Sequence, residues 1–157
     1  MDPKLAELVA LEEIRRLTWL YAHHRDRLDI EGLMSVFTED AICDFGPDLG
    51  GSVIGADAIR AHFQRSMQQF GDGKPFCTMH AVTNPWIEFR DTDTAFGRTY
   101  LIDFIIDGSD RNPLTFLGLY DDEFRKVKEG WKIRRRRLEL AWPPRQARGT
   151  APGETPA

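Results

Sequence analysis

The spacing of apolar residues predicts a long first helix. From about residue 5 to residue 28, apolar side chains return every three or four positions, which is the period of a helix with one buried face. The residues that set this period are Leu8, Leu11, Ile14, Leu17 and Tyr21. Asp29 is then a suitable N-cap for a second, shorter helix that carries Leu33, Met34 and Phe37.

A third helix and a run of strands follow. The segment GADAIRAHFQRSMQQF begins at Gly55 and repeats apolar residues at helical spacing until the GDGKP turn at 71–75. Its apolar face consists of Ile59, Phe63, Met67 and Phe70. DAICDFG predicts a short strand, and Gly and Pro at 46–51 then predict a loop. Four long strands are predicted at about 76–90, 94–107, 114–127 and 131–142, and the short turns between them indicate antiparallel hairpins.

This order of elements predicts an α+β fold in residues 1–142. A curved, mostly antiparallel sheet would wrap around about three N-terminal helices and form a cone with an interior. The chain has 157 residues, of which 41% are hydrophobic, enough for one core but not for a second domain. Residues 143–157 are rich in proline, glycine and polar groups, so this tail is expected to be disordered.

Charge and composition narrow the range of partners. A net charge of -4 gives no overall attraction to nucleic acid or anionic membranes and favours a neutral small molecule. The IRRRRLE run does not change this, because strand alternation sends neighbouring arginines to opposite faces. Only Cys43 and Cys77 occur and no leader precedes Leu5, so a cytoplasmic location is expected. The sequence has no metal-binding motif and no apolar run of about 20 residues, so we predict no metal, cofactor or membrane span.

Three segments together resemble the SnoaL-like branch of the nuclear-transport-factor-2-like (NTF2-like) superfamily. They are LTWLYAHHRDRLDIEGLMSVFTEDAICDFG, HAVTNPWIEFRDTDTAFGRTYLIDF and YDDEFRKVKEGWKIRRRR, and with Gly55 between the first two they extend the match over about residues 5–140. The resemblance implies a cone-shaped fold with a pocket for a small, mostly apolar molecule. It also implies self-association as a trimer or dimer, to which hydrophobic sheet surface outside the cone would contribute.

The resemblance also suggests an active site. The family includes polyketide cyclases, scytalone dehydratase, bile-acid dehydratase, a dehydrochlorinase, ketosteroid isomerase, epoxide hydrolases and noncatalytic subunits, so fold alone does not give the reaction. The set that resembles bile-acid dehydratase is Tyr21, Asp26, His80 and Asp103. An Asp–His pair is also the dyad expected in the dehydrochlorinase. The family often carries an arginine three residues after the isoleucine of its GW+I signature, here Arg136, with Arg135 and Arg137 as alternatives if a bulge shifts the register.

Two other activities of the family fit this sequence less well. Ketosteroid isomerase places its base on the strand after the second helix, at the position of Phe45, and the neighbouring Asp44 would point to the opposite face. The epoxide hydrolases carry Arg and Asp two residues apart on a strand, whereas Arg98 is followed by Tyr100 here.

Each candidate has a chemical role and a plain structural alternative. A histidine side chain titrates near neutral pH, so His80 suits a general base whose tautomer Asp26 would fix. Tyr21 and Asp103 would hold a carbonyl oxygen or assist a departing hydroxyl. Alternatively, His80 and Tyr21 are hydrogen-bonded core residues, Asp103 forms a structural salt bridge, and Asp26 is solvated. On an ideal helix Asp26 lies about 140° from Tyr21, so both reach one pocket only if the helix ends or bends there.

We therefore expect a cofactor-independent lyase that eliminates water or another β leaving group from a hydroxylated carbonyl compound, such as a steroid or polyketide-like ring. The candidate apolar walls of its pocket are Phe45, Phe63, Met67, Trp86, Phe104 and Phe116. An isomerase or cyclase acting through the same enolate is the first alternative. The second is a noncatalytic binding or assembly subunit, like the small subunit of ring-hydroxylating dioxygenases.

Overall fold

The computed structural model describes residues 2–70, 77–107 and 111–142. The helices are α1 (Pro3–Asp26), α2 (Ile30–Ser35) and α3 (Ala56–Phe70), with a single 3-10 turn, η1 (Pro47–Leu49). The strands are β1 (Phe37–Asp44), β2 (Ser52–Ile54), β3 (Cys77–Phe89), β4 (Thr94–Ile106), β5 (Leu114–Val127) and β6 (Gly130–Trp142). The predicted tail at 143–157 lies outside the described residues.

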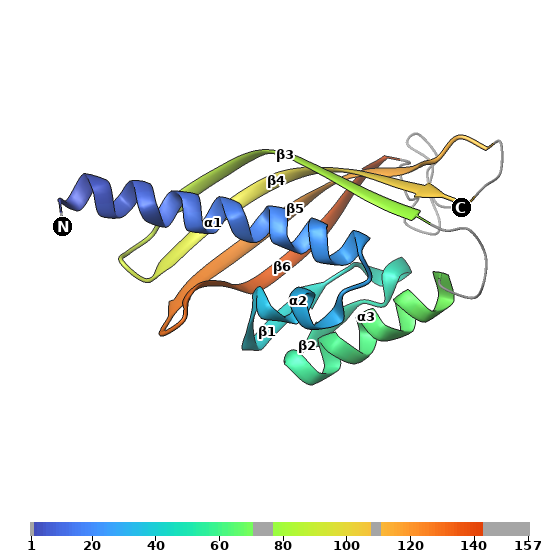
Figure 1. The fold of residues 1–157 in the computed structure, drawn as a ribbon, viewed down its shortest axis with the longest axis horizontal. Coiled ribbons are helices and arrows are strands. Elements are labelled where there is room, and N and C mark those ends of the chain that lie inside the picture. Colours follow the sequence, from blue (N-terminus) through green and yellow to red (C-terminus); the bar gives the residue numbers. More distant parts are fainter. Residues whose placement is uncertain (1, 71–76, 108–110, 143–157) are drawn as a thin grey trace, which may run out of the picture.

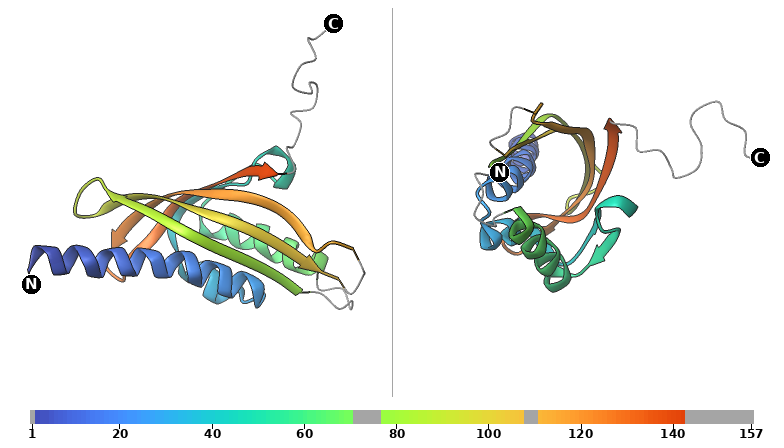
Figure 2. Two further views of the ribbon diagram at one scale, coloured as in Figure 1. Left: turned by 90° about the horizontal axis from the view of Figure 1, so that it is seen from above. Right: turned by 90° about the vertical axis from the view of Figure 1, so that its right-hand side faces the viewer.

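The six strands form one sheet in the order β2-β1-β6-β5-β4-β3. Every neighbouring pair is antiparallel except β1 and β6, which run parallel. The sheet curves, and the helices lie within its bend, as the end-on view in Figure 2 shows. Helix α1 packs against β3 and β6, whereas α3 packs against β1, β2 and α2 (Figure 1). The predicted α+β cone with a mostly antiparallel sheet is confirmed.

Local signals explain where the helices begin and end. Helix α1 begins two residues earlier than its apolar period indicates, because the Asp2 carboxylate caps it by accepting a hydrogen bond from the backbone N–H of Lys4. It ends at Asp26, with Arg27 as the C-cap. Asp29 is the N-cap of α2, as predicted, and its carboxylate accepts from the Gly32 N–H at 3.0 Å.

The second helix is shorter than its apolar residues indicate. Phe37 was expected on that helix but is the first residue of β1, where it pairs with Ile133 of β6. The chain turns into the sheet because the Val36 carbonyl accepts a hydrogen bond from the Ile133 N–H at 2.8 Å. Glycines with positive φ at 46, 50 and 51 then turn the chain back, and β2 pairs antiparallel with β1.

Two bulges change which residues face the interior. In β3 the register shifts between Thr83 and Trp86, where Asn84 has a φ of 52°. In β6, Ile133 and Arg135 oppose adjacent residues of β5, so Arg134 is the extra residue. An extra residue reverses the alternation of side chains beyond it. Both bulges therefore decide which predicted residues reach the candidate site.

The convex face of the sheet carries exposed aromatic and aliphatic side chains. Met79 and Trp86 of β3 and Phe96 and Tyr100 of β4 are among the large apolar residues that remain exposed. This surface fits the expected self-association, which stays a prediction. Within the described part of the chain, none of the helices is both long and apolar enough to span a membrane.

Candidate functional site

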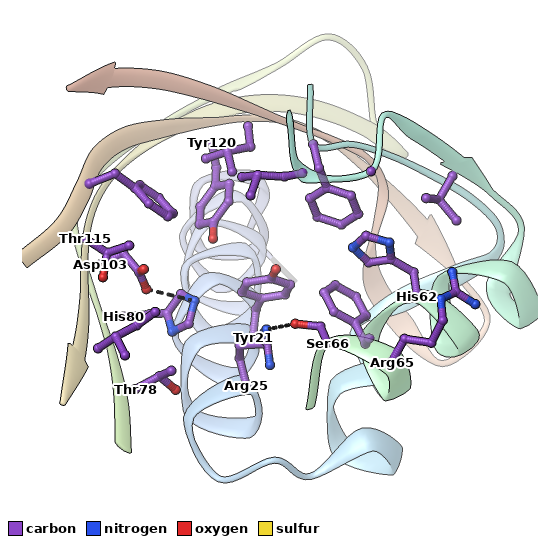
Figure 3. Close-up of a pocket in the computed structure, with 18 residues that line it drawn as sticks. Tyr21, Arg25, His62, Arg65, Ser66, Thr78, His80, Asp103, Thr115 and Tyr120 are labelled. Atoms are coloured by element: carbon purple, nitrogen blue, oxygen red, sulfur yellow. Dashed lines mark hydrogen bonds and ion pairs between the residues drawn. The ribbon is translucent and has the colours of Figure 1, made fainter. Parts of the chain in front are cut away.

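A cavity of about 540 Å³ lies between α1, α3 and the concave face of the sheet. This volume is in the range that small-molecule sites occupy. Apolar side chains form much of its wall, and the polar residues that line it are Tyr21, Arg25, His62, Arg65, Ser66, Thr78, His80, Asp103, Thr115 and Tyr120. Figure 3 shows these side chains, with His80 and Asp103 on the β3–β4 side of the cavity and His62 and Arg65 on the α3 side.

Asp26 holds His80 from behind. The Nδ1 atom of His80 lies 2.6 Å from Oδ1 of Asp26, and the backbone N–H of His80 donates to Oδ2 of the same carboxylate at 3.0 Å. The hydroxyl of Thr78 donates to Oδ1 at 3.1 Å. Burial alone would raise the pKa of Asp26, but the hydrogen bonds from His80 and Thr78 lower it below its ordinary value. An ionised Asp26 fixes the proton of His80 on Nδ1 and leaves Nε2 on the cavity side.

The end of α1 explains how Asp26 reaches this position. Asp26 is the last helical residue, and α1 packs against β3, so its carboxylate points to the back of the His80 ring. Tyr21 points into the cavity from a different side of the helix. The two residues therefore do not both line the cavity. This agrees with the angle of about 140° that separates them on a straight helix. Asp26 contacts His80 without lining the cavity.

Asp103 faces the other nitrogen of the same ring. His80 and Asp103 are directly opposite in the β3–β4 pair, which puts both side chains on the concave face. Oδ1 of Asp103 lies 3.4 Å from Nε2 of His80. Burial is the main cause of a raised pKa at Asp103, and the electrostatic effects of His80 and Arg25 only partly offset it. The carboxyl of Asp103 thus keeps its proton to higher pH than an exposed carboxyl does.

Replacing Asp103 with asparagine should change how stability depends on pH. A carboxyl whose pKa is raised by folding contributes most below its unfolded pKa and loses that contribution as pH rises through the folded pKa. The Asp103→Asn variant should therefore gain stability relative to the wild type as the pH rises above the ordinary carboxyl pKa and through the raised pKa of Asp103. Urea unfolding at several pH values measures this. The prediction would be contradicted if the wild type became more stable relative to the variant as the pH rises. Glu88→Gln, on the exposed side of β3, is the control.

Tyr21 and Tyr120 form the floor of the cavity, and a buried ion pair packs against the side of their rings that faces away from the cavity. Tyr21 and Tyr120 pack edge to face with ring centroids 5.5 Å apart, and burial raises the pKa of both phenols. Arg136 lies over both rings, with its guanidinium carbon 4.1 Å and 4.0 Å from their centroids. It donates to Asp122 through Nε at 2.8 Å and through Nη2 at 2.7 Å. Both phenols therefore remain protonated at neutral pH.

Arg25 extends the polar wall from α1 towards α3. Its Nη2 donates to the hydroxyl of Ser66 at 2.6 Å. His62 stacks on Phe45 with ring centroids 4.5 Å apart, and burial first, then Arg65 and Arg25, lower its pKa. His62 is therefore uncharged at neutral pH and can donate one hydrogen bond.

Residues 6–137 match the SnoaL-like domain family. The chain belongs to that family. It is 31% identical over 133 residues to uncharacterized protein Rv2910c of Mycobacterium tuberculosis, a match that covers 84% of this chain and 86% of the relative.

Solved structures share this SnoaL-like fold. A scytalone-dehydratase-like protein from Novosphingobium aromaticivorans superposes with a TM-score of 0.76 and 26% identity, over 87% of each chain. An NTF2-like protein with a cystatin-like fold from the same organism gives a TM-score of 0.73 and 24% identity, over 95% of this chain and 89% of its own. The second comparison concerns the fold alone.

The SnoaL-like arginine of the last strand does not reach the cavity. Arg136 is 0% exposed and lies behind Tyr21 and Tyr120, outside the cavity lining. The bulge at Arg134 explains why it faces inward, since Ile133 and Arg136 lie three residues apart yet are both buried. Arg135 and Arg137, the two alternatives, are exposed. Arg136 is therefore not placed to contact a ligand in the cavity. Instead, it packs against the rings of Tyr21 and Tyr120 from behind.

The predicted walls divide into two groups. Phe45, Phe63 and Phe116 line the cavity of this SnoaL-like domain, whereas Met67 is buried in the core beside it. The prediction is wrong for Trp86, which is 59% exposed because the bulge after Thr83 turns it to the convex face. It is also wrong for Phe104, since neighbouring residues of a strand face opposite sides and Asp103 faces inward.

Sequence reasoning missed the polar residues near α3. Arg25 lies four residues after Tyr21, a spacing that puts both on one helix face, and this signal was available. His62 and Ser66 flank the apolar face of α3 that Phe63 defines, which helical geometry also places beside the core. Tyr120 points into the cavity because it pairs with Thr99 in the β4–β5 register. The sequence alone does not reveal this register.

Proposed function

We propose that this SnoaL-like protein is a cofactor-independent lyase of the dehydratase type, acting on a small hydroxylated carbonyl compound such as a steroid or polyketide-like ring. The observation that supports it is the Asp26–His80 dyad, meaning the Nδ1 atom of His80 held by the Asp26 carboxylate at 2.6 Å with Nε2 on the cavity side. A histidine held in this way accepts a proton at Nε2, and the carboxylate stabilises the imidazolium that forms.

The proposed elimination proceeds through an enolate. Nε2 of His80 removes the proton from the carbon next to the carbonyl, and the electron pair of that C–H bond moves into the enolate. The phenols of Tyr21 and Tyr120 donate hydrogen bonds to the developing oxyanion. The enolate then expels the β-hydroxyl, which leaves as water after taking a proton. Asp103 is the suited donor, because its raised pKa retains a proton to higher pH.

Burial of these groups supports catalysis over simple storage of an apolar ligand. Asp103 is 5% exposed, and a buried carboxyl lowers stability unless it is paired or protonated. A cavity that only stored an apolar molecule would gain nothing from two carboxyls around one imidazole. Groups whose environments push their pKa values apart, here Asp26 down and Asp103 up, are typical of acid–base sites.

Proton exchange in deuterium oxide tests the first step directly. The purified protein is incubated with β-hydroxycyclohexanone, a β-hydroxydecalone and a β-hydroxysteroid ketone, and deuterium at the α carbon is followed by NMR. We expect enzyme-dependent deuterium uptake together with loss of one water mass. Uptake without mass loss would indicate an isomerase or cyclase instead. Binding of these ketones without any exchange would exclude the proposed lyase and favour the noncatalytic subunit.

A further inference from the structure

Arg25 is buried at the cavity wall without a carboxylate partner. Its side chain is 9% exposed, and its only hydrogen bond among the described residues runs from Nη2 to Ser66. Nη1 is buried and has no hydrogen-bond partner in the part of the chain that the structure describes. A buried guanidinium is costly unless its N–H groups are satisfied. The cavity, which Arg25 lines, is the space from which a partner can come.

Other arginines of the protein differ from Arg25 in this respect. Arg60 pairs with Glu31, Arg98 with Asp121, and Arg136 with Asp122. Asp103 is close enough to Arg25 for the guanidinium to lower its pKa, yet within the described ranges no ion pair joins the two. The charge of Arg25 is therefore left for a ligand to neutralise.

The surroundings of Arg25 strengthen the positive charge. Arg65 of α3 also lines the cavity, and Figure 3 shows it beside His62 on the side away from His80. Among the lining residues that the structure describes, Asp103 is the only acid. The cationic end, defined as Arg25, His62, Arg65 and Ser66, thus carries positive charge although the whole chain has a net charge of -4.

We propose that the cationic end binds a carboxylate of the substrate. One carboxylate oxygen would accept from Nη1 of Arg25, and the hydroxyl of Ser66 and an N–H of His62 would be further donors. A carboxylate fits better than a bulkier anion, because Nη2 of Arg25 is already occupied and the ring must share the same cavity. The inference rests on the proposed lyase and refines it: the substrate is a hydroxylated keto acid, anchored at α1 and α3 while His80 faces its ring.

Matched ligands test the cationic end without requiring turnover. Calorimetry would compare a β-hydroxycyclohexanone carrying a carboxylate with its methyl ester. We expect the wild type to prefer the carboxylate about ten- to a hundredfold, the effect of one charge-assisted hydrogen bond. Arg25→Gln should lose that preference, and Arg25→Lys should keep part of it. Arg60→Gln, on α3 but paired with Glu31 at the surface, should retain it fully.

Thermal unfolding separates ligand binding from a structural role. Without ligand, Arg25→Gln should unfold at the same temperature as the wild type or higher, since an incompletely paired charge leaves the protein interior. A large drop in melting temperature would overturn the inference, as would equal affinity of the wild type for acid and ester. A preference for the acid without deuterium exchange would retain the carboxylate site and reject the lyase. Deuterium exchange without a preference for the acid would retain the lyase and reject the carboxylate site.

Discussion

Asparagine in place of Asp26 should lower the rate of α-deuterium exchange by about a hundred- to ten-thousandfold if the proposed dyad is the base. The Asp26 carboxylate accepts a hydrogen bond from the Nδ1–H of His80, which leaves Nε2 unprotonated for its proposed role as the base. An asparagine amide can instead donate to Nδ1, which moves the ring proton to Nε2 and removes the lone pair that the mechanism needs. His80→Ala should cause a loss of the same size, and the double variant should lose little more, because the two residues act as a unit.

The chain contains a matched control for this experiment. His24 and Asp29 form a second Asp–His pair, with Nδ1 2.8 Å from Oδ2, away from the cavity lining. Asp29 also caps α2, and asparagine is an equally good N-cap. Asp29→Asn should therefore leave both exchange and stability nearly unchanged. If Asp26→Asn exchanged deuterium as fast as Asp29→Asn, the dyad would not be the base.

Local patterns predicted the fold because they act within one element. The apolar period of α1 and the Asp29 cap are local signals, and both agree with the structure to within a few residues. The parallel pairing of β1 with β6 could not be predicted, because it joins Cys43 to Arg136 across most of the chain. Phe37 is apolar in either setting, so only its pairing with Ile133 decides between helix and strand.

The candidate site was predictable only where strand alternation continues undisturbed. His80 and Asp103 share a face because they pair directly with each other and the β3–β4 register is unbroken from Cys77 to Thr83. One extra residue near Asn84 was enough to turn Trp86 outward, and the sequence does not mark that position as a bulge. The proposed role of Arg25 depends on the absence of an ion pair to it among the described residues, and this absence follows from the packing and not from the residue type.

The two inward arginines of the site region contrast in their partners. Arg136 is fully buried and its Nη1 also lacks a hydrogen-bond partner among the described residues, but a bidentate carboxylate and two aromatic faces pair its charge within the protein. Burial would lower the pKa of Arg136, but the Asp122 carboxylate raises it, so the guanidinium keeps its charge. Arg25 has the hydroxyl of Ser66 and lies 5.7 Å from the centroid of the Phe63 ring, but no carboxylate forms an ion pair with it among the described residues. Arg136 should therefore matter for stability, whereas Arg25 should matter for binding.

Methionine in place of Arg136 should lower the free energy of unfolding by about 3–5 kcal/mol, because Asp122 is then left buried without a counter-charge. Such a loss is a large part of the roughly 5–15 kcal/mol that stabilises a typical domain. Urea unfolding at neutral pH measures it. Arg98→Met removes an equally bidentate but exposed arginine from Asp121 and should change stability little.

The double variant Arg136→Met, Asp122→Leu decides why the single variant is unstable. If the cost is the unpaired carboxylate, removing both charges should recover most of the lost stability, since a well-packed apolar pair often replaces a buried ion pair without loss. If the double variant stays as unstable as Arg136→Met, the main contribution of Arg136 is its contact with the rings of Tyr21 and Tyr120. In that case the floor of the cavity would loosen, and deuterium exchange should fall in parallel with stability.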